Sequence, residues 1–327
     1  MSHDFESGFF VQTPPWHGLC TVLPDAPQTS LEAVTAAGLN WEVTKEKMEA
    51  VVPVNGTYRA VGVPDHYAVI RRKVENGITR LDSLGVVGQQ YRLIQNIDAF
   101  RFFDPLIETG KVQYNTAGSL KGGRIIWVLA RVNGTLQIAK DDLVDKYLLI
   151  TNSHDGSRPI TIAFSPIRIV CSNTLSLALR GATGDKRLTV RHTASAGARI
   201  EDAGAFLAGV DDLFEQNADV FRLLARRSIR TIELDNYLRT LFPDPAETAM
   251  RNSARVTREK VLARFENGLG TDMTATSLWR AYNSVVEFID HDRNINNPDA
   301  RVHSAWFGQG KQLKNTALQL AVQLAAA

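Results

Sequence analysis

The sequence predicts an α+β fold, in which an N-terminal antiparallel-sheet domain with a β-β-β-α core is followed by a mainly helical C-terminal region. Strand-like segments rich in β-branched residues recur up to about residue 195, with Asn-Gly and Asp-Gly turn signals between them. From residue 200 onward, apolar residues recur at the three- and four-residue spacing of amphipathic helices. Because 327 residues exceed what one ordinary core holds, we expect two domains, an α+β domain at 1–195 and a helical domain at 196–327.

The first elements are a short helix and a series of strands. Ser30 is a suitable N-cap for a helix that ends at Gly38. The expected strands cover 41–48, 57–63, 67–74 and 88–96. The turn signals between them are Asn55-Gly56, Pro64-Asp65 and Asn76-Gly77. A helix is then expected from an N-cap at Asn96 to a stop at Gly110.

The central block supplies the β-β-β-α core. Its expected strands lie within 111–118, 122–132 and 146–166, where Pro166 ends the last one, and a further short strand covers 186–193. Ser172 or Asn173 is expected to cap a helix over 173–180. The C-terminal helices are expected at 200–228, 231–241, 246–266, 274–290 and 311–325.

Residues 148–179 combine polar, reactive side chains with an otherwise apolar stretch. Asp155-Gly156 is a strong tight-turn signal between two apolar segments, so we expect a hairpin with its tip there. A metal site needs at least three ligands, and this stretch offers only His154 and Asp155. A composite site with His291, Asp292 and His303 is the rival interpretation, and it stays open at this point.

Other chemical signatures are missing from the sequence. It has no Gly-x-Ser-x-Gly elbow, no phosphate-binding GxxxxGK[ST], no GxGxxG after a strand and no HExxH. Cys20 and Cys171 lack CxxC spacing, so we expect two unpaired thiols, with Cys171 buried. Cys171 with His192 is the alternative nucleophile–base pair. We expect no cofactor and no tightly bound metal, and more readily a binding protein than an enzyme.

The basic residues are unevenly distributed. Residues 121–200 contain twelve Lys and Arg against five Asp and Glu, whereas the whole chain carries a net charge of only +2. Residues 222–264 contain ten basic side chains against five acidic ones. Guanidinium groups near glycine-rich loops can follow a phosphate backbone, and aromatic rings such as those of Tyr91 and Tyr114 can stack on bases. The candidate nucleic-acid-binding residues are Lys121, Arg124, Trp127, Arg158, Arg168, Lys186, Arg187 and Arg191.

Several segments together resemble one known family, the phage/plasmid-like proteins grouped as domain of unknown function 932. The segments that carry the resemblance are PPWHGLC (14–20), YRLIQNIDAFRFFDPLI (91–107), GGRIIWVLARV (122–132), NSHDGSRPITIAFSPIRIVCSNTLSLAL (152–179), RHT (191–193), TSLWRAYNSVVEFIDHDR (276–293) and GQGKQLKNTA (308–317). Cys20 stands where the family pattern has glycine. The resemblance implies a role in the DNA metabolism of a mobile element and assigns no catalytic residue.

These observations lead to three function hypotheses. The first is a nucleic-acid-binding protein in DNA replication or recombination, with single-strand DNA binding or annealing as its activity and a homo-oligomer as its form. β-β-β-α units with basic faces also occur in single-strand annealing recombinases of the RecT and Erf type, which is an analogy of fold. The second is a metal- or thiol-dependent enzyme centred on His154/Asp155 with His291/Asp292. The third is a non-catalytic regulatory or structural protein. The composition, 44% hydrophobic and 22% charged, and the absence of a membrane-length apolar run predict a cytoplasmic protein.

Overall fold

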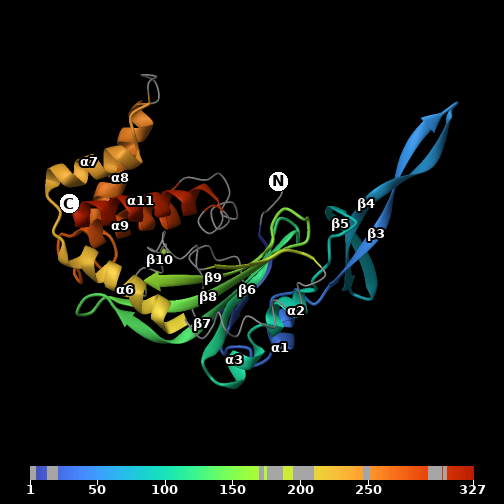
Figure 1. The fold of residues 1–327 in the computed structure, drawn as a ribbon, viewed down its shortest axis with the longest axis horizontal. Coiled ribbons are helices and arrows are strands. Elements are labelled where there is room, and N and C mark those ends of the chain that lie inside the picture. The colour runs from blue at the N-terminus through green and yellow to red at the C-terminus, as the bar shows by residue number, and fades with distance from the viewer. Residues whose placement is uncertain are drawn as a thin grey trace. The chain divides into compact units, whose positions relative to one another are not determined.

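The computed structural model describes residues 5–12, 21–168, 173–174, 187–193, 210–245, 251–293, 304 and 308–327 (Figure 1). The strands are β1 (Phe5–Val11), β2 (Thr21–Leu23), β3 (Glu42–Val54), β4 (Thr57–Glu75), β5 (Ile78–Gly88), β6 (Val112–Leu120), β7 (Ile125–Gln137), β8 (Leu143–Ser153), β9 (Ile160–Arg168), β10 (Asn173–Thr174) and β11 (Arg187–Val190). The helices are α1 (Ser30–Ala36), α2 (Asn96–Arg101), α3 (Asp104–Glu108), α6 (Val210–Arg226), α7 (Thr231–Leu241), α8 (Arg251–Asn267), α9 (Leu278–Glu287), the π-helix η2 (Phe288–Asp292) and α11 (Gln309–Ala326). Strands dominate the N-terminal half and helices the C-terminal half, so the predicted α+β class is confirmed.

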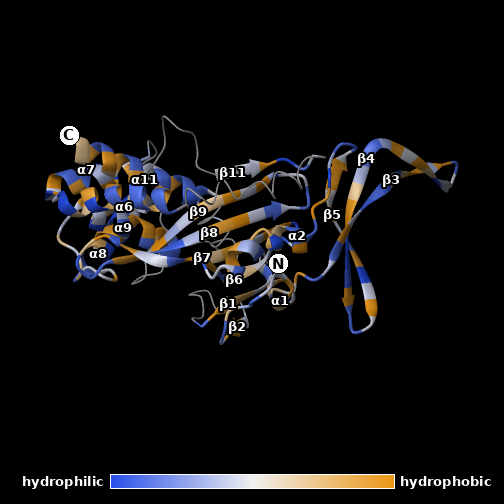
Figure 2. Ribbon diagram, turned by 60° about the horizontal axis from the view of Figure 1, so that its bottom comes forward, coloured by the Kyte–Doolittle hydropathy of each residue, from blue (hydrophilic) through white to orange (hydrophobic). Residues whose placement is uncertain are grey.

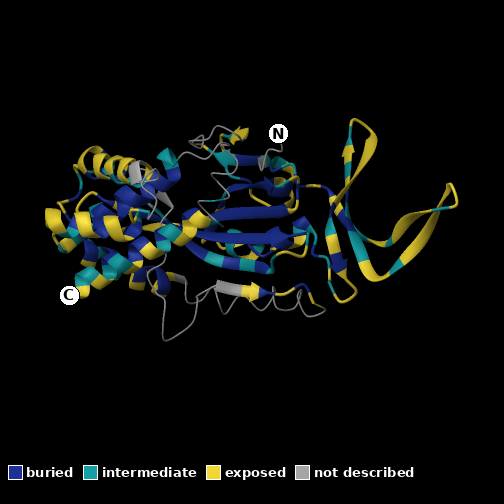
Figure 3. Ribbon diagram, turned by 90° about the horizontal axis from the view of Figure 1, so that it is seen from above, coloured by how far each residue is buried: buried dark blue, intermediate teal, exposed yellow. Residues whose placement is uncertain are grey.

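The larger sheet contains the predicted core strands. Its order is β10-β9-β8-β7-β6-β1-β2, and β11 pairs with β9 at the side. The segments that join β6 to β9 in sequence are 121–124, 138–142 and 154–159. Because a parallel crossover needs a dozen or more residues, connections this short make successive neighbours antiparallel. The apolar side chains of β7 and β8 form much of the buried core, as the dark strands of Figure 3 show.

The second sheet is a three-stranded meander, β3-β4-β5. Its two turns lie at the predicted dipeptides, where Asn55 and Gly56 have φ of 50° and 78° and Asn76 and Gly77 have φ of 52° and 78°. These left-handed conformations explain why Asn and Gly occupy the turn positions. The far part of β3 and β4 is exposed on both faces, including Val51 at 66% and Tyr58 at 78% of their surface (Figure 3).

Two expectations in this region are wrong. Pro64-Asp65 is no turn between strands, because β4 continues through it, with Asp65 at φ 60° and a shift of pairing register on β3 between Lys47 and Met48. The dipeptide therefore makes a β-bulge. Residues 89–95, expected as a strand, have no strand pairing. Hydrogen bonds with His192, Asn152 and Val43 hold the segment instead. The helix that follows is divided into α2 and α3, and Gly110 ends it at φ 67°, as expected.

The described chain divides into two compact units that interleave along the sequence. Unit 1 consists of 1–131, 148–163 and 187–207, and unit 2 of 132–147, 164–186 and 208–327. The predicted boundary near residue 195 lies within 194–209, outside the described residues. The same holds for most of the helix expected at 173–180, of which Asn173 and Thr174 form strand β10.

Unit 2 contains the helices α6 to α11. Helix α9 is buried except at Arg280, which is half-buried, and α6, α8 and α11 pack against it. The indole Nε1 of Trp279 donates a hydrogen bond of 2.7 Å to Asp142 Oδ2 on the β7–β8 connection. Figure 2 shows how apolar and polar residues alternate along these helices, the pattern from which they were predicted. Every helix within the described part of the chain is too short or too polar to cross a membrane.

Candidate functional site

Segment 91–96 connects three polar side chains that are far apart in sequence, all within unit 1. Alternate residues of the segment make the contacts. Arg92 N donates to His192 O, and Arg92 O accepts from the ring Nδ1 of His192. Ile94 O accepts a bond of 3.4 Å from Asn152 Nδ2, and Asn96 contacts the ring of His154. The segment itself is fixed to β3, because the side-chain amide of Gln95 makes two hydrogen bonds with the backbone of Val43. We call His154, His192 and Asn152 with this segment the histidine cluster.

His154 is fully buried directly after the end of β8. Asn96 Nδ2 donates to Leu39 O, so its Oδ1 faces the ring and must accept from His154 Nε2 at 2.8 Å. This contact fixes the tautomer with the proton on Nε2 and leaves Nδ1 as the acceptor atom. The rings of His154 and Trp41 pack in a T-shaped arrangement, with centroids 5.3 Å apart. Burial lowers the pKa of His154 to about 3, and the nearby His192 adds to this effect, so the ring is neutral at physiological pH.

His192 is fixed in the same manner from the other end of the segment. Its Nδ1 lies 3.1 Å from the carbonyl oxygen of Arg92, which can only accept, so Nδ1 carries the proton and Nε2 is the acceptor atom. The ring stacks on Tyr91 with centroids 4.5 Å apart, and the Tyr91 hydroxyl donates to Ser153 O. Burial lowers the pKa of His192, against the opposing effect of the Arg92 contact.

Three acceptor atoms of the histidine cluster are buried without a hydrogen-bond partner among the described residues. They are His154 Nδ1, His192 Nε2 and Asn152 Oδ1. Buried polar atoms almost always have a partner, and those that do not call for a physical explanation. Each of the three side chains uses its other polar atom on segment 92–96, so none is free to turn.

The loop 154–159 is the predicted hairpin tip between β8 and β9, which are neighbours in the sheet, so the hairpin prediction is confirmed. Gly156 has φ 73°, and Asp155 Oδ1 accepts from Ser157 N at 2.9 Å. Ser153 Oγ closes the loop by accepting from Arg158 N and donating to Arg158 O. The tip is not wholly exposed, because His154 points into the core and Asp155 presses on Gly85.

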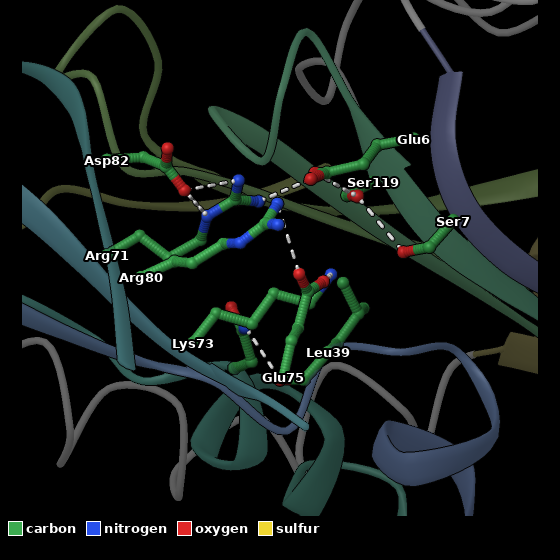
Figure 4. A network of polar contacts seen from close by, with 10 residues as sticks. Glu6, Ser7, Leu39, Arg71, Lys73, Glu75, Arg80, Asp82 and Ser119 are labelled. Atoms are coloured by element: carbon green, nitrogen blue, oxygen red, sulfur yellow. Dashed lines mark hydrogen bonds and ion pairs between the residues drawn. The ribbon is translucent and has the colours of Figure 1, made fainter. Parts of the chain in front are cut away.

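A buried guanidinium, that of Arg71, also packs on Trp41. Arg71 on β4 forms ion pairs with Glu6 at 2.6 Å and Asp82 at 2.7 Å (Figure 4). Its guanidinium also lies over the Trp41 ring, 5.4 Å from the centroid. The two carboxylates raise the pKa of Arg71 despite its burial. Since Trp41 contacts both Arg71 and His154, this network fixes one wall of the histidine cluster.

Three exposed arginines lie on segments that are bonded or adjacent to residues of the histidine cluster. Arg92, Arg124 and Arg191 are exposed, and none of them has a carboxylate partner in the described parts of the chain. Their segments are bonded to one another around the cluster, because Arg124 O accepts from His154 N and Arg92 N donates to His192 O. Val190 pairs with Ile160, so Arg191 and Arg158 lie near each other at the ends of β11 and β9. We call Arg92, Arg124 and Arg191 the cationic rim.

The other binding residues predicted from the sequence differ in how far they are buried. Lys121 is half-buried at φ 54° in the β6–β7 turn, and Arg158 is half-buried in the hairpin loop. Trp127 is 1% exposed and Tyr114 equally buried, so both rings pack in the core and neither presents a stacking surface. Arg168 and Arg187 lie on β9 and β11, and their side chains are outside the described part, as is the whole of Lys186.

The residues of the rival metal or thiol site lie in different parts of the chain. His154 belongs to unit 1, whereas His291 and Asp292 belong to unit 2, in the π-helix η2. Asp292 forms an ion pair of 2.6 Å with Arg264. Within the described ranges, no group of three or more His, Cys, Asp or Glu side chains is placed to hold a metal ion. Cys20, Cys171 and His303 lie outside the described residues.

Sequence reasoning missed several residues of the cluster. Asn96 was interpreted as a helix cap, and the structure makes Gln95 the N-cap while the Asn96 side chain contacts Leu39 and His154. Trp41 and Asn152 were interpreted only as parts of strands. The family resemblance could have pointed to the cluster. Three of the segments that carry it contribute residues here, namely 91–107, 152–179 and 191–193.

The comparisons with known proteins give one match. The family model described as Domain of unknown function (DUF932) matches residues 83–306, which include the histidine cluster and the cationic rim. No curated protein and no solved structure matches the chain. Because the family model covers more than half of the 327 residues, the chain belongs to the family described as Domain of unknown function (DUF932).

Proposed function

We propose that this chain is a nucleic-acid-binding protein that uses the cationic rim to hold a phosphate backbone. One observation carries the proposal. Arg92, Arg124 and Arg191 are exposed to solvent, and none of them forms an ion pair with a carboxylate among the described residues. An exposed arginine that is not ion-paired keeps its full charge and its donors for a phosphate. Binding to phosphates releases condensed counterions, which favours association at low salt.

The arginines of the helical region differ from the cationic rim because most of them are ion-paired, so they serve as an internal comparison. Ion pairs engage most of those between 222 and 264, although the sequence count there was also strongly basic. The pairs are Arg222 with Glu215 and Asp219, Arg227 and Arg230 with Glu233, Arg239 with Asp235 and Asp244, Arg255 with Glu259, Arg258 with Asp244, and Arg264 with Glu287 and Asp292. We therefore assign the binding face to unit 1 and not to these helices.

The position of Tyr91 supports a preference for single-stranded nucleic acid. Tyr91 is half-buried and stacks on His192 beside Arg92, which places aromatic rings next to cations. Adjacent aromatic and basic side chains are typical of proteins that bind single-stranded nucleic acid. The resemblance to phage/plasmid-like proteins adds the setting, replication or recombination of the DNA of a mobile element in the cytoplasm, with annealing as the activity.

The extended hairpin of β3 and β4 supports a homo-oligomeric form. Val51, Tyr58 and Val61 are each more than half exposed there, and both edges of the three-stranded sheet are unpaired among the described strands. Long edge strands with exposed apolar side chains readily pair with another chain. Sedimentation of the wild type and of Val51→Lys/Val61→Lys measures this directly, with a smaller assembly expected for the variant.

The binding proposal is tested by measuring DNA affinity against salt concentration with fluorescence anisotropy. Each phosphate contact contributes about 0.7 to 0.9 to the slope of log affinity against log salt, so Arg92→Ala/Arg124→Ala/Arg191→Ala should flatten the slope by about 2. The matched control is Arg222→Ala/Arg239→Ala/Arg255→Ala, in which the same charge is removed from ion-paired arginines, and its slope should remain close to that of the wild type. Single-stranded and duplex DNA of equal length are compared side by side.

Two results would remove the proposal. One is undetectable binding of either DNA at low salt, and the other is an equal slope for the rim variant and the wild type. The chain would then be interpreted as a regulatory or structural protein.

A further inference from the structure

The histidine cluster contains more buried hydrogen-bond acceptors than donors. In this cluster His154 Nδ1, His192 Nε2 and Asn152 Oδ1 all offer lone pairs, and the described residues supply no donor to any of them. Asn152 and His154 are two positions apart at the end of β8, and His192 lies close enough to His154 to lower its pKa. A cation between these side chains would accept their lone pairs, whereas an anion would be repelled by them. We propose that these three atoms bind a divalent transition-metal ion.

The second contacts of the two histidines are those expected of metal ligands. Metal-binding histidines usually donate their other ring N–H to a carbonyl or carboxylate oxygen, which fixes the tautomer and the direction of the lone pair. His154 donates to the amide oxygen of Asn96 at 2.8 Å, and His192 donates to the backbone oxygen of Arg92 at 3.1 Å. Both acceptors come from the segment 92–96, so a single stretch of backbone orients both rings.

The ligand types indicate which ions fit. Two imidazole nitrogens with an amide oxygen suit borderline ions such as Zn²⁺, Co²⁺ or Mn²⁺ better than Ca²⁺, which takes six to eight oxygen ligands. These ligands are neutral, so the charge of the ion needs compensation nearby. Asp155 is the next residue after His154, and its carboxylate acts on the pKa of both His154 and Tyr91.

The proposal departs from the sequence expectation of no bound metal, and it uses a different set of ligands from the rival His154/His291 site. It also rests on observations independent of the cationic rim, so it stands or fails separately from the proposed DNA binding. The competing occupant is a buried water molecule, which makes about three hydrogen bonds in sites of this kind but can donate only two.

The test uses the full-length chain with metal ions alone. Protein as purified is analysed for elemental metal, then stripped with a chelator, dialysed and titrated with Co²⁺ by calorimetry and visible absorption. We expect about one equivalent of bound metal per chain and visible absorption bands from nitrogen-ligated Co²⁺. A cluster that holds only water gives neither stoichiometric metal nor these bands, and that result overturns the proposal.

Three variants localise the site. His192→Gln removes one ligand and should weaken Co²⁺ binding at least about 100-fold, and Asn96→Leu removes the oxygen that orients His154 and should weaken binding about 10- to 100-fold. His66→Gln is the control, since His66 is an exposed histidine of β4, and its affinity should stay within about twofold of the wild type. Equal affinity of His192→Gln and wild type, or equal loss in His66→Gln, contradicts the assignment. If His192→Gln does not fold, paramagnetically shifted imidazole proton signals in the Co²⁺-loaded wild type decide, because two histidine ligands give two exchangeable N–H signals.

Discussion

His154 Nε2 lies 2.8 Å from Asn96 Oδ1, and the two residues are 58 positions apart in sequence. Both side chains are buried, and Asn96 also donates to Leu39 O, so one amide joins the end of α1, the start of α2 and the β8–β9 loop. The stability of the loop is therefore coupled to a residue that no local pattern connects with it.

Asn96→Ala is expected to destabilise the protein by about 2 to 4 kcal/mol. The substitution leaves the His154 N–H and the Leu39 carbonyl buried without partners, and each such group costs about 1–3 kcal/mol. Urea unfolding followed by circular dichroism measures the change. Asn236→Ala, at an exposed position of α7, is the control and should change stability by less than about 0.5 kcal/mol. Similar losses for both variants would contradict the structural role of Asn96.

Gly85→Ala is expected to displace the hairpin loop. A Cβ atom at Gly85 would lie 2.6 Å from the Cα of Asp155, and backbone cannot yield as a flexible side chain can. Overpacking of this kind costs about 1–3 kcal/mol. Gly88→Ala is the matched control in the same strand, since its Cβ would meet nothing within 4 Å. Thermal unfolding of the two variants should separate them clearly, and equal midpoints would show that the loop is not in this position.

Lys314→Met is expected to destabilise the helical unit strongly. Lys314 and Asp290 form a 2.6 Å ion pair in which the side chains are 1% and 4% exposed. Removing one partner of a buried pair leaves an uncompensated charge and costs about 3–5 kcal/mol, whereas replacing both restores much of the loss. The comparison is between Lys314→Met and Lys314→Met/Asp290→Leu in chemical denaturation. Glu259→Gln, in the exposed pair with Arg255, should have almost no effect. A single variant as stable as the double variant would refute this prediction.

The contribution of Glu233 to stability is expected to depend on pH. Hydrogen bonds from the side chain and the backbone of Arg230 lower the pKa of Glu233 to about 2, from a usual value of 4.5. A carboxyl whose pKa is lower in the folded state stabilises it above the unfolded-state pKa, and this stabilisation is lost as pH falls from about 4.5 toward 2. The Tm of Glu233→Gln should therefore lie below that of the wild type at pH 6 and approach it near pH 2.5. Glu266→Gln, exposed on α8, should follow the wild type at every pH, and a Glu233 difference that is constant with pH would contradict the assignment.

Local signals predicted the elements well wherever local physics decides them. Helix α7 has the bounds expected from its apolar spacing, and the Asn-Gly turns have the left-handed conformations that those residues tolerate. Residues 89–95 were predicted wrongly because Tyr91 and Ile94 favour strands, whereas the segment uses its backbone to hold His192 and Asn152. Tertiary contacts of this kind override a weak local preference.

The candidate site could be predicted only in part. His154 was singled out, yet its full burial and its contact with Asn96 depend on how distant segments meet. Charge counts showed two basic segments but could not distinguish the exposed Arg124 from Arg264, which has two carboxylate partners. The distinction requires coordinates, because ion pairs join residues that are up to 28 positions apart in that region.

The interleaving of the two units has a consequence for synthesis on the ribosome. Residues 132–147, which belong to unit 2, emerge well before residues 208–327, with which they form that unit. Unit 1 in turn waits for its last segment, 187–207, which contains His192. Unit 1 is therefore complete only once residue 207 has emerged, and unit 2 only once its last segment has, in contrast to proteins whose N-terminal domain is one continuous early segment. Strand β7 has residues in both units and waits for segments that emerge later, so shortened chains that end before residue 187, in which both units are incomplete, should be bound by chaperones or degraded.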